Sequence, residues 1–182
     1  MIIAGYPGIG KTTLASNDFR FIDLESSIFQ KRGGEEWYRL YCEVAINLSQ
    51  QGYDVFVSTH KQVRDILINS KEEFIAIIPA IEIKRTWENK LELRYEHDKN
   101  EKNHRALHRA RNHYNEDIGL IMRECPVVVI IKDSYYDLIT MVEIGKEKLH
   151  AYKTMTELNS LDKLKKLNVD LIQLLCANEE TE

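Results

Sequence analysis

A glycine-rich motif near the N-terminus constrains this chain more than any other feature. Residues 5–12 read GYPGIGKT and match the pattern G-x-x-x-x-G-K-[ST]. An apolar run, residues 1–4, precedes the motif, and the helix-compatible run TTLAS follows Lys11. Three of the eight glycines in the 182 residues lie within the first ten. This strand–loop–helix context predicts a loop whose backbone cradles a phosphate group.

Each residue type in the motif suits the binding of a phosphate group. Glycines let the backbone curl so that successive N–H groups point at one phosphate, and the following helix adds the positive end of its dipole. The ammonium of Lys11 reaches the β- and γ-phosphates, and the hydroxyl of Thr12 is a ligand for Mg²⁺. The motif thus predicts that the phosphates of a nucleotide and Mg²⁺ bind at Gly5, Gly8, Ile9, Gly10, Lys11, Thr12 and Thr13.

Further apolar runs indicate an α/β fold. Besides residues 1–4, strands are predicted at residues 20–24, 54–58, 74–78 and 127–131. Several runs are almost continuously apolar, as in parallel strands buried on both faces. Helical periodicity falls between them and after them, at residues 35–51, 62–69, 81–95, 105–123 and, in two or three pieces, from 135 to the end. This alternation predicts one domain, residues 1–182, with a three-layer, doubly wound parallel sheet of five strands.

Composition excludes several classes. The formal net charge of −4 argues against nucleic acid as the main partner, because a chain built to hold it would be basic. Three widely spaced cysteines fit neither a disulfide framework nor a metal motif, so we expect a reducing, cytoplasmic setting. With no apolar run of about 20 residues and no signal-peptide pattern, no membrane partner is expected.

Acidic residues follow the second predicted strand, in the sequence FIDLESS. Because the carboxyl ends of neighbouring parallel strands open onto one crevice, Asp23 is expected to face the phosphate loop. There it would hold Mg²⁺ together with Thr12, or accept a proton from an attacking oxygen, and Glu25 would lie nearer the acceptor. The alternative is that both carboxylates merely cap the next helix.

A basic segment, residues 84–113, interrupts the strand pattern. It holds nine Lys or Arg against five Asp or Glu, and four of the six histidines. We expect a helical lid whose arginines Arg94, Arg105 and Arg109 stabilise charge on a transferred phosphoryl group. The alternative is an ordinary solvated face. His104 and His108, four residues apart, have metal spacing but no third ligand, which favours a surface cluster.

The acceptor of the phosphoryl group is expected to lie near Asp23, Glu25, Tyr38 and Arg39. The candidates to bind it are Glu25, Tyr38, Arg39 and Arg64, with Arg32 as a further phosphate-gripping arginine. Trp37 and Tyr41 could wall a base pocket, but their positions also fit the core stripe of a helix.

The run IIAGYPGIGKTTLA resembles the G-x-P-G-x-G-K-x-T loop of adenylate kinase and other nucleoside monophosphate kinases. FIDLESS is similar to the end of the second strand in shikimate- and gluconate-kinase-like proteins and in small phage-type nucleotide kinases. The specific match covers about the first 27 residues, and the rest agrees in layout only. The resemblance implies the strand order 2-3-1-4-5, ATP·Mg²⁺ as donor, and adenine packing near residues 132–136. The family's D-G-[FY]-P-R sequence after the third strand is absent, since Ser58, Thr59 and His60 occupy that place.

The phosphate loop alone does not name a reaction. A guanine-recognition motif of the N-K-x-D type is absent, and no paired acids end the third strand, so GTPase and AAA-type readings are disfavoured. We expect a nucleoside or deoxynucleoside monophosphate kinase. Two alternatives stay open: a kinase of another small metabolite, and a regulatory nucleotide-binding protein without phosphotransfer. The C-terminal helices could also pair two subunits into a homodimer.

Overall fold

Five parallel strands form one sheet in the order β2-β3-β1-β4-β5. They are β1 (Ile2–Gly5), β2 (Phe21–Asp23), β3 (Asp54–Val57), β4 (Phe74–Pro79) and β5 (Val128–Ile131). The computed structural model describes residues 1–70 and 72–179. Every run predicted to be a strand is one, to within a residue or two at its ends. The α/β class, the parallel direction and the strand order are confirmed.

The central strands are buried on both faces. All six residues of β4 and all four of β1 are buried. Because successive side chains of a strand point to opposite faces, both faces of the sheet must be covered. This explains why the strands read as continuous apolar runs.

In the described part of the chain, seven helices connect and flank the strands. They are α1 (Lys11–Asn17), α2 (Ser26–Arg32), α3 (Trp37–Gln50), α4 (Lys61–Asn69), α5 (Lys84–His97), α6 (Glu101–Glu124) and α7 (Leu138–Glu179), with 3₁₀ turns at Gly34–Glu36 and Ile81–Ile83.

Two helices differ from the prediction. Helix α2 has no counterpart among the predicted elements, and it begins where the side chain of Glu25 accepts a hydrogen bond from the Ser27 N–H. Helix α7 is one helix, not two or three, because its sequence contains no proline and only one glycine, Gly145.

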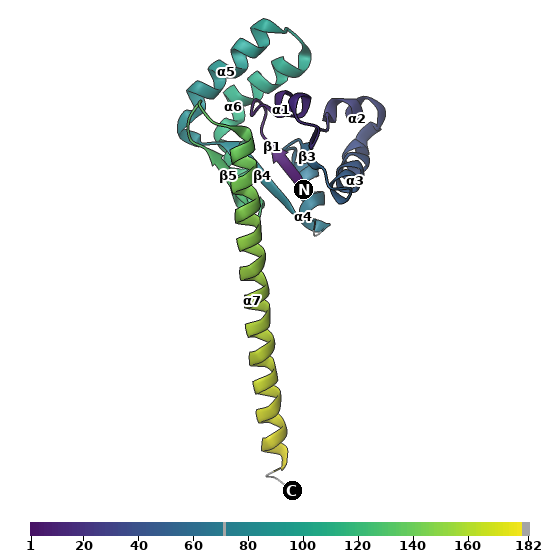
Figure 1. Ribbon diagram of the computed structural model, residues 1–182, viewed down its shortest axis with the longest axis vertical. Coiled ribbons are helices and arrows are strands. Elements are labelled where there is room, and N and C mark those ends of the chain that lie inside the picture. Colours follow the sequence, from purple (N-terminus) through teal and green to yellow (C-terminus); the bar gives the residue numbers. More distant parts are fainter. Residues whose placement is uncertain (71, 180–182) are drawn as a thin grey trace. The chain divides into compact units, whose positions relative to one another are not determined.

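The predicted excursion is a pair of helices between β4 and β5, and Figure 1 shows α5 and α6 side by side. Helix α6 runs without interruption from the excursion to Glu124, shortly before β5 begins at Val128, because its apolar positions repeat along its whole length. Buried residues along it include Leu107, Tyr114, Ile118 and Ile121.

The chain divides into two compact units, Met1–Lys146 and Glu147–Glu182. The first contains the whole sheet and the start of α7, where Gly145 lies against Ile75 of β4 and Val129 of β5. The second continues α7 and exposes Tyr152, Met155, Leu158 and Leu161. Over the residues described, no helix combines the length and the apolar composition that crossing a membrane requires.

Candidate active site

The glycine-rich loop, residues 5–12, connects β1 to α1 at the carboxyl edge of the sheet. Gly8 and Gly10 have φ values of 92° and 96°, a left-handed conformation that only glycine adopts readily. A Cβ on Gly5 would lie 2.7 Å from side-chain atoms of both Ile9 and Lys11. The first helical hydrogen bond of α1 runs from Leu14 N–H to Gly10 C=O. The N–H groups of the residues before Leu14 therefore have no acceptor within α1. The sequence pattern therefore corresponds to a real backbone requirement.

Helix α5 packs directly on this loop. The indole Nε1 of Trp87 donates a hydrogen bond of 2.9 Å to the Pro7 carbonyl, and Gly8 approaches both Trp87 and Leu91. Trp87 and Leu91 are each only 1% exposed. The base of the excursion is thus fixed to the loop by buried contacts.

The ammonium of Lys11 folds back over the loop. It donates hydrogen bonds to the carbonyls of Gly5, at 2.8 Å, and Tyr6, at 3.5 Å. The pKa of Lys11 is lowered to about 8, mainly by burial; the positive charges of Lys102 and Arg94 also lower it, whereas Asp23 and Glu25 raise it. An anion on the loop would relieve this unfavourable environment of the lysine.

Thr12 and Asp23 meet as the sequence predicts. The Thr12 hydroxyl donates a hydrogen bond of 2.6 Å to the Asp23 carboxylate. A hydroxyl and a carboxylate oxygen are hard ligands that suit Mg²⁺, which usually takes its remaining ligands from phosphates and water. The two residues fit this ion as part of its coordination shell. Within the described part of the chain, no group of three or more His, Cys, Asp or Glu could hold a metal ion by itself.

Glu25 connects two sides of the site. One oxygen caps α2, and the other accepts a hydrogen bond from the ammonium of Lys102, near the start of α6. Partial burial opposes ionisation of Glu25, but the bonds from Lys102 and Ser27 outweigh it and hold the pKa of this carboxyl below its ordinary value. Glu25 thus caps α2 and also lines the cavity, whereas Asp23 contacts Thr12.

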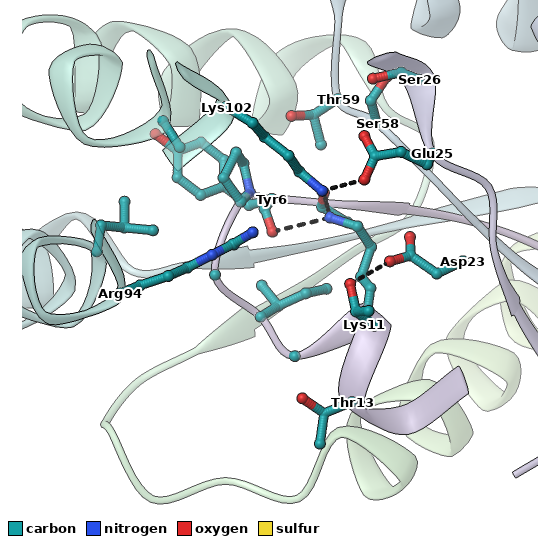
Figure 2. A pocket seen from close by; sticks show the side chains of 18 of the residues that line it. Tyr6, Lys11, Thr13, Asp23, Glu25, Ser26, Ser58, Thr59, Arg94 and Lys102 are labelled. Carbon is teal, nitrogen blue, oxygen red and sulfur yellow. Dashed lines mark hydrogen bonds and ion pairs between the residues drawn. The ribbon is translucent and has the colours of Figure 1, made fainter. Parts of the chain in front are cut away.

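These groups surround a cavity of about 960 Å³ at the carboxyl ends of β1, β2 and β3. Figure 2 shows Arg94 and Lys102 reaching toward Lys11 from the excursion, with Asp23 and Glu25 approaching it from the β2 side. Sites for single ligands commonly have volumes of about 300–1,000 Å³. The volume of this cavity is at the upper end of that range, which leaves room for more than one small ligand.

The arginines named from sequence differ in their partners. Arg94, Arg105 and Arg109 all line the cavity, and so does Arg64. Arg64 is 4% exposed and uses all three guanidinium nitrogens, for Glu124 and the Thr59 carbonyl. Arg109 bonds the Asp117 carboxylate through two of its nitrogens. Arg64 thus joins α4 to the end of α6, and this contact explains its burial.

The third strand contributes residues that the sequence did not single out as site residues. Ser58, Thr59 and His60 line the cavity, and His60 Nδ1 lies 2.9 Å from the Ser58 hydroxyl. Burial and then the charges of Arg109, Arg105, Arg64 and Lys11 lower the pKa of His60, so the ring is neutral near pH 7. The strand-end rule that pointed to Asp23 could also have pointed to these residues. Lys102 and Asp117 were missed because nothing in their spacing separates them from surface charges.

Tyr38 and Arg39 are not among the residues that line this cavity. Arg39 pairs with Glu36 on the surface, and the Arg32 side chain lies outside the described part of the structure. Tyr41 is fully buried, and its hydroxyl bridges the Leu24 carbonyl and the Ser58 N–H. Tyr41 therefore aligns the ends of β2 and β3 from inside the core.

The segment after β5 contributes an aromatic wall. Tyr136 lines the cavity and stacks on Trp87, with ring centroids 6.2 Å apart and planes 23° apart. The ammonium of Lys90 lies over both rings and bonds the Tyr136 hydroxyl. This wall lies where the resemblance places the adenine of the donor.

His104 and His108 lie on exposed faces of α6, with ring centroids 6.4 Å apart. The ring of Tyr95 lies next to that of His104, with centroids 5.5 Å apart. Their arrangement agrees with a surface cluster.

Comparisons of the chain with protein-family models, with curated proteins and with solved structures found no match.

Proposed function

We propose that this protein is an ATP- and Mg²⁺-dependent phosphotransferase whose acceptor is a nucleoside or deoxynucleoside monophosphate. One observation carries the proposal: Lys11, Thr12 and Asp23 lie on one side of a single cavity, and cationic side chains of α5 and α6 lie on the other. A polyphosphate on the glycine-rich loop would be enclosed between these two sides. Charges placed around a transferring phosphoryl group are the main catalytic device of such enzymes.

The donor would lie with its phosphates on the glycine-rich loop and its base beside Tyr136. Thr12 and Asp23 would hold Mg²⁺, which neutralises charge on the β- and γ-phosphates. Arg94 and Lys102 would add positive charge near Lys11, where the transferred group is expected. The acceptor would approach past Glu25, Ser58 and His60.

A kinase of another small metabolite is the second candidate, and a specific observation favours it. The acceptor side of the cavity is rich in hydroxyl and amide groups, which suit a hydroxylated acceptor: Ser26, Ser27, Gln30, Ser58 and Thr59. Arg64, which was expected to grip an acceptor phosphate, is already fully bonded. The two candidates therefore differ in the acceptor and share the donor site.

The test is turnover with ATP·Mg²⁺ and a panel of ribo- and deoxynucleoside monophosphates, with small polyols and hydroxy acids in parallel. We expect ADP formation that requires a monophosphate acceptor, with the phosphorylated product identified by ³¹P NMR. Turnover only with a hydroxylated metabolite would support the second candidate. ATP binding without turnover on any acceptor would favour the regulatory nucleotide-binding alternative.

Lys11→Ala is the matched active-site variant, with Lys31→Ala as its control because Lys31 is an exposed lysine outside the cavity. We expect Lys11→Ala to lower kcat by at least 10²-fold, as loss of a preorganised positive group does, and Lys31→Ala to have no effect. Full activity of Lys11→Ala would refute the assignment of the loop.

A further inference from the structure

Arg109 and Asp117 form a fixed pair on one face of α6. Nε of Arg109 donates to Oδ2 of Asp117 and Nη2 donates to Oδ1, both at 2.6 Å. Two parallel bonds of this kind fix the plane of the guanidinium as well as its position. The Asp117 side chain is 10% exposed, whereas that of Arg109 is 63% exposed.

The pair leaves part of the guanidinium available to a ligand. Both residues line the cavity, and within the described chain Nη1 of Arg109 has no hydrogen-bond partner. Arg64 is the opposite case. Its side chain is 5% exposed, and all three nitrogens of its guanidinium are bonded. The carboxylate of Asp117 thus orients Arg109 without enclosing it.

Asp117 also lies near the glycine-rich loop. Burial first, and the negative charge of Asp117 second, raise the pKa of Tyr6, the residue that follows Gly5. Tyr6 in turn meets Tyr114 of α6 edge to face, with centroids 5.8 Å apart. The part of α6 that carries Asp117 is therefore packed against the loop, which makes it a firm base for an oriented arginine.

We infer that Asp117 is a positioning residue that holds the guanidinium of Arg109 in the cavity, aimed at an anionic group of the substrate. The inference rests on the proposed function for the identity of that substrate. Without the carboxylate, the long Arg109 side chain would explore many rotamers and lose its fixed fork geometry. Asp117 itself makes no contact with the reacting atoms in this scheme.

The pKa of His60, measured by NMR of its ring, tests the positioning directly and needs no activity. Arg109 is among the charges that lower this pKa, so Arg109→Ala should raise it. Removing the carboxylate in Asp117→Asn would by itself leave more positive charge and lower the pKa of His60. A rise in Asp117→Asn therefore requires that Arg109 has moved away, and this rise is the expected result. An unchanged or lower pKa would overturn the inference.

Kinetics give the second readout. We expect Asp117→Asn and Arg109→Ala to lower kcat by similar factors of at least tenfold, and the double variant to be no worse than Arg109→Ala alone. Glu116→Gln, on an exposed neighbour in α6, is the control and should match the wild type. Independent, multiplying losses would contradict a shared role.

A third variant covers the case in which Asp117→Asn does not fold. Arg109→Lys keeps the charge on an exposed side chain but cannot form the two parallel bonds. We expect Arg109→Lys to lower kcat almost as much as Arg109→Ala does. A wild-type kcat in this variant would refute the positioning role of Asp117. If no phosphotransfer is found with any acceptor, the proposed function fails, while the His60 measurement still decides the role of Asp117.

Discussion

The ammonium of Lys11 is held in an environment that disfavours its charge. It is enclosed by the glycine-rich loop and faces Lys102 and Arg94, and these effects lower its pKa to about 8. The ordinary lysine value is about 10.4. At neutral pH the folded protein therefore carries a charge that would be more stable in the unfolded chain. A charged group with a strongly shifted pKa is typical of a site that binds a ligand of opposite charge.

Lys11→Met is expected to stabilise the protein at pH 7 by about 1–2 kcal/mol, because it removes this disfavoured charge. The folded-state pKa of Lys11 is lowered, so the unfavourable contribution is complete below about pH 8 and disappears as pH rises toward the unfolded value. Urea unfolding at pH 7 and pH 10 measures the difference, with exposed Lys31→Met as control. A stabilisation that does not shrink at the higher pH would contradict this explanation.

Helix α5 and the glycine-rich loop behave as one element in this structure. Gly8 lies where α5 comes closest, and a Cβ there would meet Leu91 Cδ2 at 3.1 Å and Trp87 Nε1 at 3.3 Å. Both contacts come from fully buried side chains. The loop is therefore shaped by its own glycines and by a helix about 80 residues away in sequence.

Gly8→Ala should destabilise the protein more than Gly52→Ala, which is the matched control. Both glycines have nearly the same φ, 92° and 95°, but no atom lies within 4 Å of a Cβ on Gly52. Gly52→Ala measures the left-handed backbone penalty alone, about 1–2 kcal/mol. Gly8→Ala adds crowding against α5, for a further loss of about 1 kcal/mol or more, and it should weaken ATP binding. Equal losses in thermal unfolding would show that α5 does not press on the loop.

At the scale of the whole molecule, the sheet depends on elements from distant parts of the chain. Glu124, at the end of α6, pairs with the buried Arg64 of α4, and Lys146 of α7 pairs with Asp54 at the start of β3. Gly145 brings the start of α7 against the sheet, where a Cβ would clash with Ile75 Cδ1 and lie 3.3 Å from Val129 Cγ2. The first unit is thus closed by contacts that no local pattern encodes.

Gly145→Ala and Gly119→Ala form a test of this closure, because both glycines lie inside helices. Alanine favours a helix over glycine by about 1 kcal/mol, so Gly119→Ala, whose Cβ has space, should stabilise the protein by up to that amount. Gly145→Ala should instead destabilise it by about 1–3 kcal/mol through overpacking against β4 and β5. Chemical denaturation measures both values, and a stabilising Gly145→Ala would mean that α7 does not pack closely on the sheet.

The sequence alone determined the strands, their parallel arrangement and the glycine-rich loop, because these depend on local signals. A continuous apolar run indicates a strand that is buried on both faces. Gly8 and Gly10 of the motif indicate positions where the backbone adopts a positive φ. The pairing of Thr12 with Asp23 was also predictable, since the ends of parallel strands share one edge.

Only the tertiary structure decided which charged side chains are available to a ligand. Arg64 and Arg109 look alike in sequence, but the guanidinium of Arg64 is fully bonded by Glu124, 60 residues away, and by the Thr59 carbonyl. Asp117 instead orients Arg109 toward the cavity. Tyr38 and Arg39 were predicted to bind the acceptor, but they do not line the cavity. Lys102 joins it through Glu25, 77 residues away. Residues far away in sequence either orient a guanidinium or ammonium toward the site or bond all of its donors. Which residues these are depends on how the chain packs.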